Sequence, residues 1–189
     1  MLLIVMAGVI GFFVSDIFRD STPSSSASKY SPAKAVSTPV PTSKPVSISS
    51  SRTVKMPDYE RLCPFTVSVP SGSEDYYVYL KYWRASGKSL TPRERSGSGT
   101  KSDISFYIKH GDSFSTEVPI GVYQLYYTCG ETWYGTDERF GAGSPTYKSD
   151  DLLEFYDDGR YLQGHTVELW LQTNGNFDRT AIPESEFPS

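Results

Sequence analysis

Short stretches in which apolar and polar residues alternate recur through the C-terminal two thirds of this 189-residue chain. In 65–69, for example, Thr66 and Ser68 lie between three apolar residues. A period of two places alternate side chains on one face of a β-strand, so each stretch predicts a strand with a buried face. The further stretches of this kind are 76–83, 104–109, 114–118, 123–129, 153–155 and 167–171.

Turn residues separate these stretches at regular intervals. The segment 110–113 carries His-Gly-Asp-Ser, 119–121 carries Pro-Ile-Gly, and the Asp-Asp-Gly of 157–159 suits a hairpin that needs positive φ. No long stretch keeps a helical period of 3.6 with capping residues. Short strands with this turn chemistry predict an all-β domain, either a single β-sandwich or a barrel, and we favour the sandwich.

The N-terminal third has a different composition. Residues 1–14 are apolar apart from two Gly, and Ser15 and Asp16 interrupt the run before Ile17 and Phe18. As a helix, residues 1–18 would span about 27 Å, against roughly 30 Å for the hydrocarbon core of a bilayer. We therefore predict a hydrophobic N-terminal helix in 1–19 that anchors the chain in a membrane by a single pass.

Two other interpretations of this segment remain open. Its apolar run has the length of the core of a secretory signal peptide, although no Lys or Arg precedes it and no Ala-x-Ala-like cleavage site follows. A buried helix of a folded domain is the second alternative. It is disfavoured because a polar spacer, and not a domain, follows directly.

That spacer occupies 20–55. Its first part, 20–52, includes 12 Ser, 3 Thr and 5 Pro and almost no large apolar side chains. Such a composition cannot bury enough apolar surface to offset the entropy lost on folding, so we predict a disordered linker. A flexible coil of this length has an end-to-end distance of about 30 Å and would hold the β-domain, predicted at 56–187, away from a surface.

Charge divides the chain in the same way. Residues 1–55 hold six basic and two acidic residues, a net charge of +4, which leaves 12 basic and 20 acidic residues, or −8, in 56–189. An acidic domain lacks the basic face that neutralises phosphates, so nucleic acid is not an expected partner. The positive-inside rule would place the basic spacer in the cytoplasm. The Ser/Thr/Pro composition and the candidate cysteine pair favour an extracytoplasmic domain, which is the orientation we predict.

One phrase goes beyond a generic β pattern. Residues 118–127, Val-Pro-Ile-Gly-Val-Tyr-Gln-Leu-Tyr-Tyr, resemble the V-P-x-G-x-Y-x-L-x-Y phrase of transthyretin-like and carboxypeptidase-regulatory-like sandwiches. The order of segments is also similar to that of an uncharacterised bacterial family of membrane-anchored proteins, whose β-domain also occurs in some J-domain-containing proteins. The other matching pieces are 64–67, 76–80, 106–108, 130–135, 140–141 and 173–176.

The resemblance covers 63–187 and implies a transthyretin-like or immunoglobulin-like sandwich on a membrane tether. It implies no activity, because the family has no established one. Two positions depart from the pattern of the family. Lys109-His110-Gly111 stands where Arg-Gly-Gly is more usual, which sets this turn apart, and Cys129 stands where a small residue is usual, which makes the thiol particular to this chain.

The two cysteines allow two interpretations. Cys63 lies at the start of the first predicted strand, and Cys129 lies at the end of a predicted core strand. In an oxidising compartment, a Cys63–Cys129 disulfide would stabilise the fold by roughly 4 kcal/mol in the chain-entropy model. Alternatively, each cysteine is a small buried group that makes no covalent bond.

Catalytic and metal sites have little support in the sequence. A thiol enzyme would need a base within hydrogen-bond reach of Cys129, and His110 and His165 are the two histidines of the chain. No nucleophile motif accompanies them. The acidic pairs 150–151 and 157–158 lack the alternating ligand spacing of a calcium loop. We therefore expect a protein that is not an enzyme and that uses no cofactor or metal.

The predicted binding surface combines an aromatic pair with a basic loop. Trp133 and Tyr134 follow a turn, where exposed rings would stack on a sugar or on an apolar side chain of a partner. Buried rings would instead close one end of the sandwich. The loop 86–102 is rich in Gly and Ser and holds Arg93 and Arg95, which suits either an anion site or a solvated hairpin loop.

These observations predict a membrane-tethered, non-catalytic binding or scaffolding domain of the cell envelope, with a protein or a polysaccharide as its partner. One alternative is a carbohydrate-binding module, which predicts a coplanar strip of exposed aromatic residues. The other is a small envelope hydrolase or thiol enzyme, which predicts a deep pocket that joins Cys129 to a histidine. A filled core with flat polar faces would favour binding over catalysis.

Overall fold

The computed structural model describes residues 41–57, 63–88, 103–169 and 178–189. The chain divides into two compact units, Met1–Val36 and Ser37–Ser189, and every described residue lies in the second. The predicted helix in 1–19 and the first part of the predicted linker therefore lie outside the described residues. Within the described ranges, no helix is long and apolar enough to cross a membrane.

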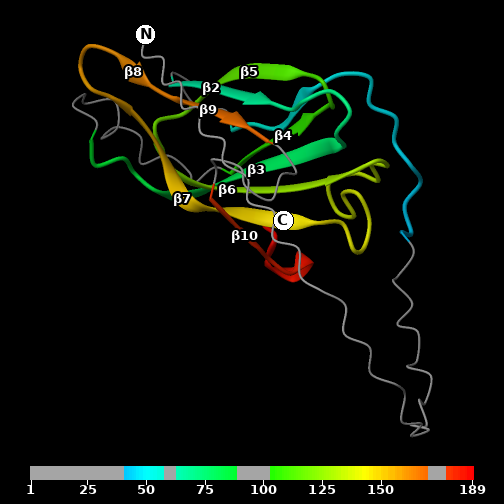
Figure 1. The fold of residues 1–189 in the computed structure, drawn as a ribbon. Coiled ribbons are helices and arrows are strands. Elements are labelled where there is room, and N and C mark those ends of the chain that lie inside the picture. The colour runs from blue at the N-terminus through cyan, green and yellow to red at the C-terminus, as the bar shows by residue number, and fades with distance from the viewer. Residues whose placement is uncertain (1–40, 58–62, 89–102, 170–177) are drawn as a thin grey trace, which may run out of the picture. The chain divides into compact units, whose positions relative to one another are not determined.

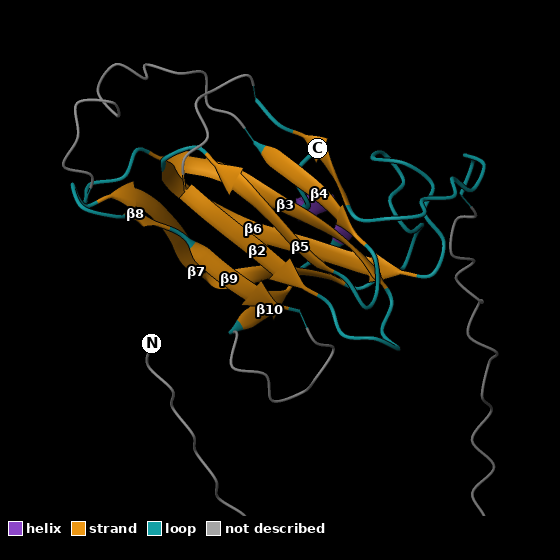
Figure 2. Cartoon of the chain, turned by 90° about the horizontal axis from the view of Figure 1, so that it is seen from above, coloured by secondary structure: helices purple, strands orange, loops and turns teal. Residues whose placement is uncertain are grey.

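The described residues form strands in two sheets that pack face to face as a sandwich (Figures 1 and 2). The larger sheet has the order β1-β4-β3-β6-β7-β10, and β8 pairs with β7 beside this path. The smaller sheet has the order β5-β2-β9, in which β2 is antiparallel to β5 and parallel to β9. The strands are β1 (Arg52–Lys55), β2 (Cys63–Ser68), β3 (Asp75–Arg84), β4 (Ile104–Ile108), β5 (Ser113–Val118), β6 (Gly121–Gly130), β7 (Thr146–Asp157), β8 (Leu162–Gln163), β9 (His165–Glu168) and β10 (Arg179–Ala181), followed by a 3-10 helix, Glu184–Glu186.

The inward-facing residues of the alternating stretches fill the space between the sheets. Phe65 of β2 lies against both Phe106 of β4 and Phe155 of β7, with ring centroids 5.8 and 5.7 Å apart. Each side chain of this size contributes about 1.5–3 kcal/mol when it is fully buried. The prediction of an all-β domain with two packed sheets is therefore confirmed.

The large sheet is buried on its other face as well. Tyr77, Tyr79 and Tyr107 lie on this outer face and are 4%, 2% and 2% exposed. They belong to a second group of buried residues, the outer aromatic cluster, whose other members are Ile48, Trp133, Phe140 and Phe187. These covering residues come from before β1, from the β6–β7 connection and from the C-terminal end. Because both faces are covered, β3 and β4 carry aromatic or aliphatic side chains on both faces.

Residues 41–55, here called the N-terminal strap, belong to the domain, so the predicted end of the linker at residue 55 is wrong. Ile48 is 8% exposed within the outer aromatic cluster. The backbone N–H of Val46 donates to the carbonyl of Trp133 at 2.7 Å, and β1 pairs with β4. The Ser- and Pro-rich composition hid this strap, because its few apolar residues find their partners far along the chain.

Glu138, in the β6–β7 connection, binds the start of the N-terminal strap. Its carboxylate accepts hydrogen bonds from the Thr42 hydroxyl and from the backbone N–H groups of Thr42 and Ser43, the last two at 2.8 and 2.7 Å. These hydrogen bonds lower the pKa of Glu138 to about 2. The contact is therefore present at neutral pH and is lost as the pH falls toward 2.

Three predicted turns are confirmed. Gly111, between β4 and β5, and Gly159, between β7 and β8, have φ values of 80° and 86°, which a residue with a Cβ atom adopts only with strain. The corner at 119–121 joins β5 to β6. The β4–β5 turn and this corner each carry the chain from one sheet to the other, so the two sheets cannot separate without unfolding both connections.

Gly164, between β8 and β9, lies against the backbone of β2. A Cβ atom there would lie 1.8 Å from the carbonyl oxygen of Pro64. We expect Gly164→Ala to lower the free energy of unfolding by about 3 kcal/mol in a urea titration, because a strand must shift. Gly87→Ala is the control, since its Cβ would meet nothing within 4 Å. Equal midpoints for the two variants would contradict this close approach.

Candidate functional site

Trp133 is not available as the predicted contact residue. It is 5% exposed, and its ring centroid lies 5.0, 5.4 and 5.1 Å from those of Tyr77, Tyr107 and Phe140. It packs on the outer face of the large sheet rather than at an end of the sandwich, because two tyrosines of that face need a cover. Tyr134 beside it is only partly exposed. The predicted aromatic pair therefore offers a partner one partly exposed ring.

Arg93 and Arg95 lie outside the described residues. The described start of their loop is held on β7 by Glu154, which pairs with Lys88 Nζ at 3.0 Å and accepts a hydrogen bond from the Ser86 hydroxyl at 2.8 Å. The first cation of the loop therefore already has a carboxylate partner. A basic site at Arg93 and Arg95 stays a prediction.

No disulfide joins Cys63 to Cys129, so the predicted pairing is wrong. Cys63 opens β2, and its Sγ lies 3.8 Å from the Tyr156 carbonyl oxygen on β7. The preceding residue of β7, Phe155, pairs with Gly121 at the start of β6. Cys129 lies eight positions further along β6, which is about 26 Å of extended strand. A disulfide requires Cα atoms within about 7 Å, and the two thiols lie at opposite ends of the core.

Cys129 is also separated from both histidines. It lies in the core between the sheets, whereas His110 is held by Asp75 beside the outer face of the large sheet. His165 packs near the start of β6, at the other end of the sandwich. Burial and the neighbouring Glu74 raise the pKa of the Cys129 thiol, which keeps it protonated and unreactive. The cysteine–histidine pair that a thiol enzyme needs is not formed by these residues.

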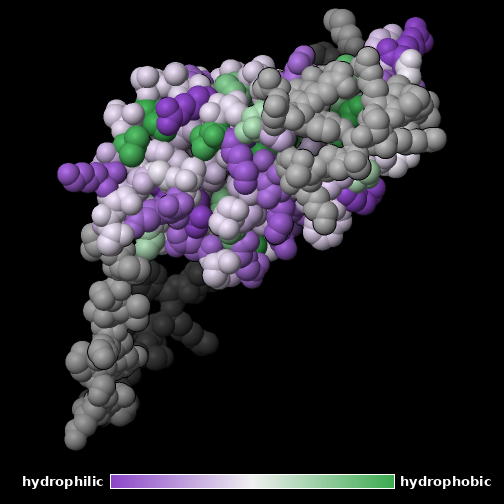
Figure 3. Space-filling view, turned by 180° about the vertical axis from the view of Figure 1, so that it is seen from behind, coloured by the Kyte–Doolittle hydropathy of each residue, from purple (hydrophilic) through white to green (hydrophobic). Residues whose placement is uncertain are grey.

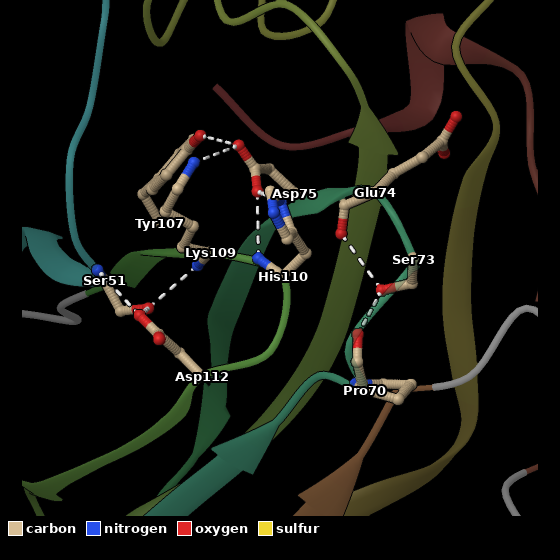
Figure 4. Close-up of polar contacts among 9 residues, drawn as sticks. All are labelled: Ser51, Pro70, Ser73, Glu74, Asp75, Tyr107, Lys109, His110 and Asp112. Atoms are coloured by element: carbon tan, nitrogen blue, oxygen red, sulfur yellow. Dashed lines mark hydrogen bonds and ion pairs between the residues drawn. The ribbon is translucent and has the colours of Figure 1, made fainter.

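One buried carboxylate gathers several polar partners at the β4–β5 turn (Figure 4). Asp75, which is 7% exposed, accepts hydrogen bonds from the Tyr107 hydroxyl and from the backbone N–H of His110, the latter at 2.9 Å. Its Oδ1 also lies 2.7 Å from His110 Nδ1, and its Oδ2 lies 3.4 Å from Lys109 Nζ. We call these four residues the Asp75 cluster.

Ser51 ties the N-terminal strap to the same turn. Its hydroxyl donates to the Asp112 carboxylate at 2.6 Å and accepts the Lys109 backbone N–H at 2.8 Å. Figure 4 shows this pair of contacts beside the Asp75 cluster. The turn is thus bonded both to the start of β3 and to the strap, which places three distant parts of the chain in one polar network.

Hydrogen bonds decide the charge of Asp75. Burial alone would raise its pKa, but the hydrogen bonds from Tyr107 and His110 and the charge of Lys109 outweigh burial and leave the pKa below its ordinary value. A carboxylate on Nδ1 orients a histidine ring and leaves Nε2 for a proton or a ligand. In this chain the same bonds hold a turn in place, and the arrangement is accounted for by stability.

The acidic pair at 157–158 forms a turn, as predicted. Asp157 accepts a hydrogen bond from the Gly159 N–H at 2.8 Å, and Asp158 accepts one from the Tyr161 N–H at 2.7 Å. Over the described part of the chain, no group of three or more His, Cys, Asp or Glu side chains is placed to hold a metal ion.

An exposed tryptophan on β3 escaped the sequence analysis. Trp83 lies beyond the outer aromatic cluster and is 60% exposed. Leu152, on β7, is 37% exposed. Gln124 of β6 pairs with Lys81 of β3 on one side and with Leu152 on the other, so these three residues form a row across three strands. Lys81 could have indicated this exposed region from the sequence. A charged residue on a strand face that is otherwise aromatic marks the place where the residues that cover that face end. We call Lys81, Trp83, Arg84, Gln124 and Leu152 the Trp83 surface.

The Trp83 surface is locally basic in an acidic domain. Lys81 and Arg84 are exposed, and within the described ranges no carboxylate pairs with either of them. Two acids of adjoining segments are bonded to other groups, whereas Asp151, which precedes Leu152, is exposed. Asp103 accepts hydrogen bonds from the Tyr82 N–H and from a tyrosine hydroxyl, each at 2.8 Å, and Glu154 holds the loop that begins at residue 86.

No protein-family model, curated protein or solved structure matches the chain. The resemblance to transthyretin-like sandwiches and to a membrane-anchored family therefore stays a prediction. A function has to be inferred from the surfaces of the domain itself.

Asp75→Asn removes the charge of the Asp75 cluster while keeping its shape. Because the folded pKa lies below the ordinary value of about 3.9, the carboxylate stabilises the fold above that pH, and this contribution is lost as the pH falls through the folded pKa. We expect the variant to lower the free energy of unfolding by about 1–3 kcal/mol at pH 7 and by less in strong acid, measured by urea titration.

Asp137→Asn is the control for this measurement, because Asp137 is an exposed acid of the β6–β7 connection. Its substitution should change the free energy of unfolding by less than about 0.5 kcal/mol at either pH. A deficit of Asp75→Asn that stays constant between neutral and acid pH would contradict a stabilising carboxylate at position 75.

Proposed function

We propose that the chain is a membrane-tethered, non-catalytic binding or scaffolding protein of the cell envelope. In this proposal 1–19 anchor it by a single pass, 20–40 form the tether, and a transthyretin-like or immunoglobulin-like sandwich faces a partner protein outside the cytoplasm. The Trp83 surface carries the proposal. An exposed tryptophan and leucine beside two cations that pair with no described carboxylate have the composition of the centre of a protein interface, where Trp and Arg dominate the binding energy.

Three properties of the domain support binding rather than catalysis. Its interior is filled by large side chains, the outer aromatic cluster covers part of the other face of the large sheet, and the Cys129 thiol lies in the core. On the face shown in Figure 3, hydrophilic residues predominate and hydrophobic residues form small, separate groups. An exposed aromatic row that would favour a carbohydrate-binding module is not formed by Trp133 and Tyr134.

The place where the chain enters the domain also supports the proposal. Pro41 lies against Gly141, close to the end of β6 at Gly130. Arg84, in the Trp83 surface, pairs with Val122 near the start of β6. These two places are separated by eight positions of extended strand, about 26 Å. A tether that enters at one end of the sandwich would present the Trp83 surface at the other end.

Site-specific photo-crosslinking in cells that produce the full chain tests this proposal. A photoreactive amino acid at position 152 should give discrete adducts in the carbonate-washed membrane fraction, and Trp83→Ala should reduce them at least about fivefold, because loss of an interface tryptophan typically weakens binding by more than 1 kcal/mol. The same amino acid at position 168 is the control, since Glu168 is exposed on the smaller sheet.

Three results would contradict the proposed function. Equal adducts from positions 152 and 168, or adducts that Trp83→Ala leaves unchanged, would remove the Trp83 surface as the binding site. Recovery of the full chain in the carbonate supernatant would remove the membrane anchor.

A further inference from the structure

β5 is an edge strand with an open side. It begins the sheet β5-β2-β9, and among the described residues it pairs with β2 alone. All six residues of β5 are matched to residues of β2 without a register shift. The side chains of Ser113, Ser115 and Glu117 are exposed on the outside of the sandwich, while Phe114 and Thr116 are partly buried.

The register shows which backbone groups of β5 face the open side. The Val69 N–H donates to the Asp112 carbonyl at 2.9 Å, which makes this a hydrogen-bonded pair in line with the β2–β5 register. In an antiparallel ladder such pairs alternate, so Phe114, Thr116 and Val118 direct their N–H and C=O groups toward β2. The groups of the exposed residues, Ser113, Ser115 and Glu117, point the other way.

The other described edges carry features that discourage strand pairing. β1 has four residues, a register shift and two cations, Arg52 and Lys55. β10 has three residues. β9 has four residues, which include His165 and Glu168. Short length, charge and irregular pairing are the usual protections of an edge. β5 is longer, is regular and has one charged residue, so its open side is the least protected of these edges.

Among the described residues, the larger sheet extends past β5 and leaves room beside it for one strand. Phe114 of β5 packs on Phe106 of β4, with ring centroids 5.7 Å apart, and β1 lies one strand beyond β4. The edge of the smaller sheet is therefore set back over the larger one by about one strand spacing of 4.8 Å. Thr53 of β1 shares the inner face with Phe106, and Met56 packs against the core, so the floor of this step is partly apolar.

We infer that the open side of β5 accepts an extended polypeptide segment of a partner protein as an added antiparallel strand. A row of alternating N–H and C=O groups is complementary to another polypeptide backbone, and the one-strand step excludes a whole second sandwich. Residues of the segment opposite Phe114 and Thr116 face the step and are apolar. The residue opposite Glu117 is Lys or Arg, since this carboxylate is the only charge on the strand.

This inference concerns a different surface from the proposed function and does not depend on the Trp83 surface. Its probe is a seven-residue peptide with the sequence of 63–69 that carries Cys63→Ser and Pro64→Lys, because β2 already pairs with β5 in this register. The new Lys lies opposite Glu117. Fluorescence anisotropy of the labelled peptide would be measured against the full chain in lipid nanodiscs. The control peptide is N-methylated at the residues opposite Ser113, Ser115 and Glu117, so it keeps its side chains and loses the donors.

Ser115→Pro is the decisive variant. The Ser115 N–H points to the open side, so proline removes a group that the added strand needs and no backbone hydrogen bond to β2, although it also removes the 3.0 Å hydrogen bond between the Ser115 and Thr66 hydroxyls. We expect the wild-type chain to bind the probe at least about tenfold more tightly than it binds the N-methylated peptide, and Ser115→Pro to lose about the same factor, as the absence of one to three ladder hydrogen bonds implies. A circular dichroism melt would establish that the variant is folded.

Glu117→Lys keeps the test decisive if Ser115→Pro does not fold. It should weaken binding of the Lys-containing probe, and a probe with Glu in place of that Lys should bind it more tightly. Equal affinity for the probe and its N-methylated form, or no binding at about 1 mM peptide, would overturn the inference. Concentration-dependent self-association that Ser115→Pro abolishes, with no response to the probe, would assign the edge to a second copy and also overturn it.

Discussion

Burial of the large sheet on both faces is the constraint on which the rest of this structure depends. One face is covered by the smaller sheet, as in any sandwich, but the other exposes Tyr77, Tyr79 and Tyr107 unless further chain lies over them. Each of these rings would leave a large apolar area in water, at a cost of about 1.5–3 kcal/mol when it is compared with full burial. The N-terminal strap, the β6–β7 connection and the C-terminal segment supply the cover.

That cover also determines which parts of the surface remain available. Trp133, which the sequence suggested as a contact residue, is buried as part of this cover, and the cover stops short of Trp83. The Asp75 cluster and the Ser51 contact fasten the strap and the β4–β5 turn at the edge of the covered region. On the other layer, β5 has an open side within the described part of the chain, where the smaller sheet is narrower than the larger one. Among the described residues, the two proposed contact surfaces are thus the part of the outer face of the larger sheet that is not covered and the edge of the smaller sheet that is not paired.

The inner face of the sandwich could be predicted from the sequence because period-two alternation is local. Phe65 and Phe106 can each be recognised as inward-facing from about five residues of local sequence. The outer aromatic cluster could not be predicted, because Ile48 lies in a Ser-rich stretch and its partners follow much later in the chain. The disulfide prediction failed for a similar reason. Its two cysteines were placed on the right strands, but the relative direction and offset of those strands depend on long-range pairing.

Comparison of two N-terminal truncations tests the two-sided cover most directly. A chain of residues 37–189 keeps the N-terminal strap, and a chain of 56–189 lacks the strap and β1. If the strap is part of the domain, urea titration should show the shorter chain to be less stable by about 3–5 kcal/mol, since it loses the burial of Ile48 and the hydrogen bonds of an edge strand. Equal unfolding midpoints for the two chains would contradict the account and return 41–55 to the linker.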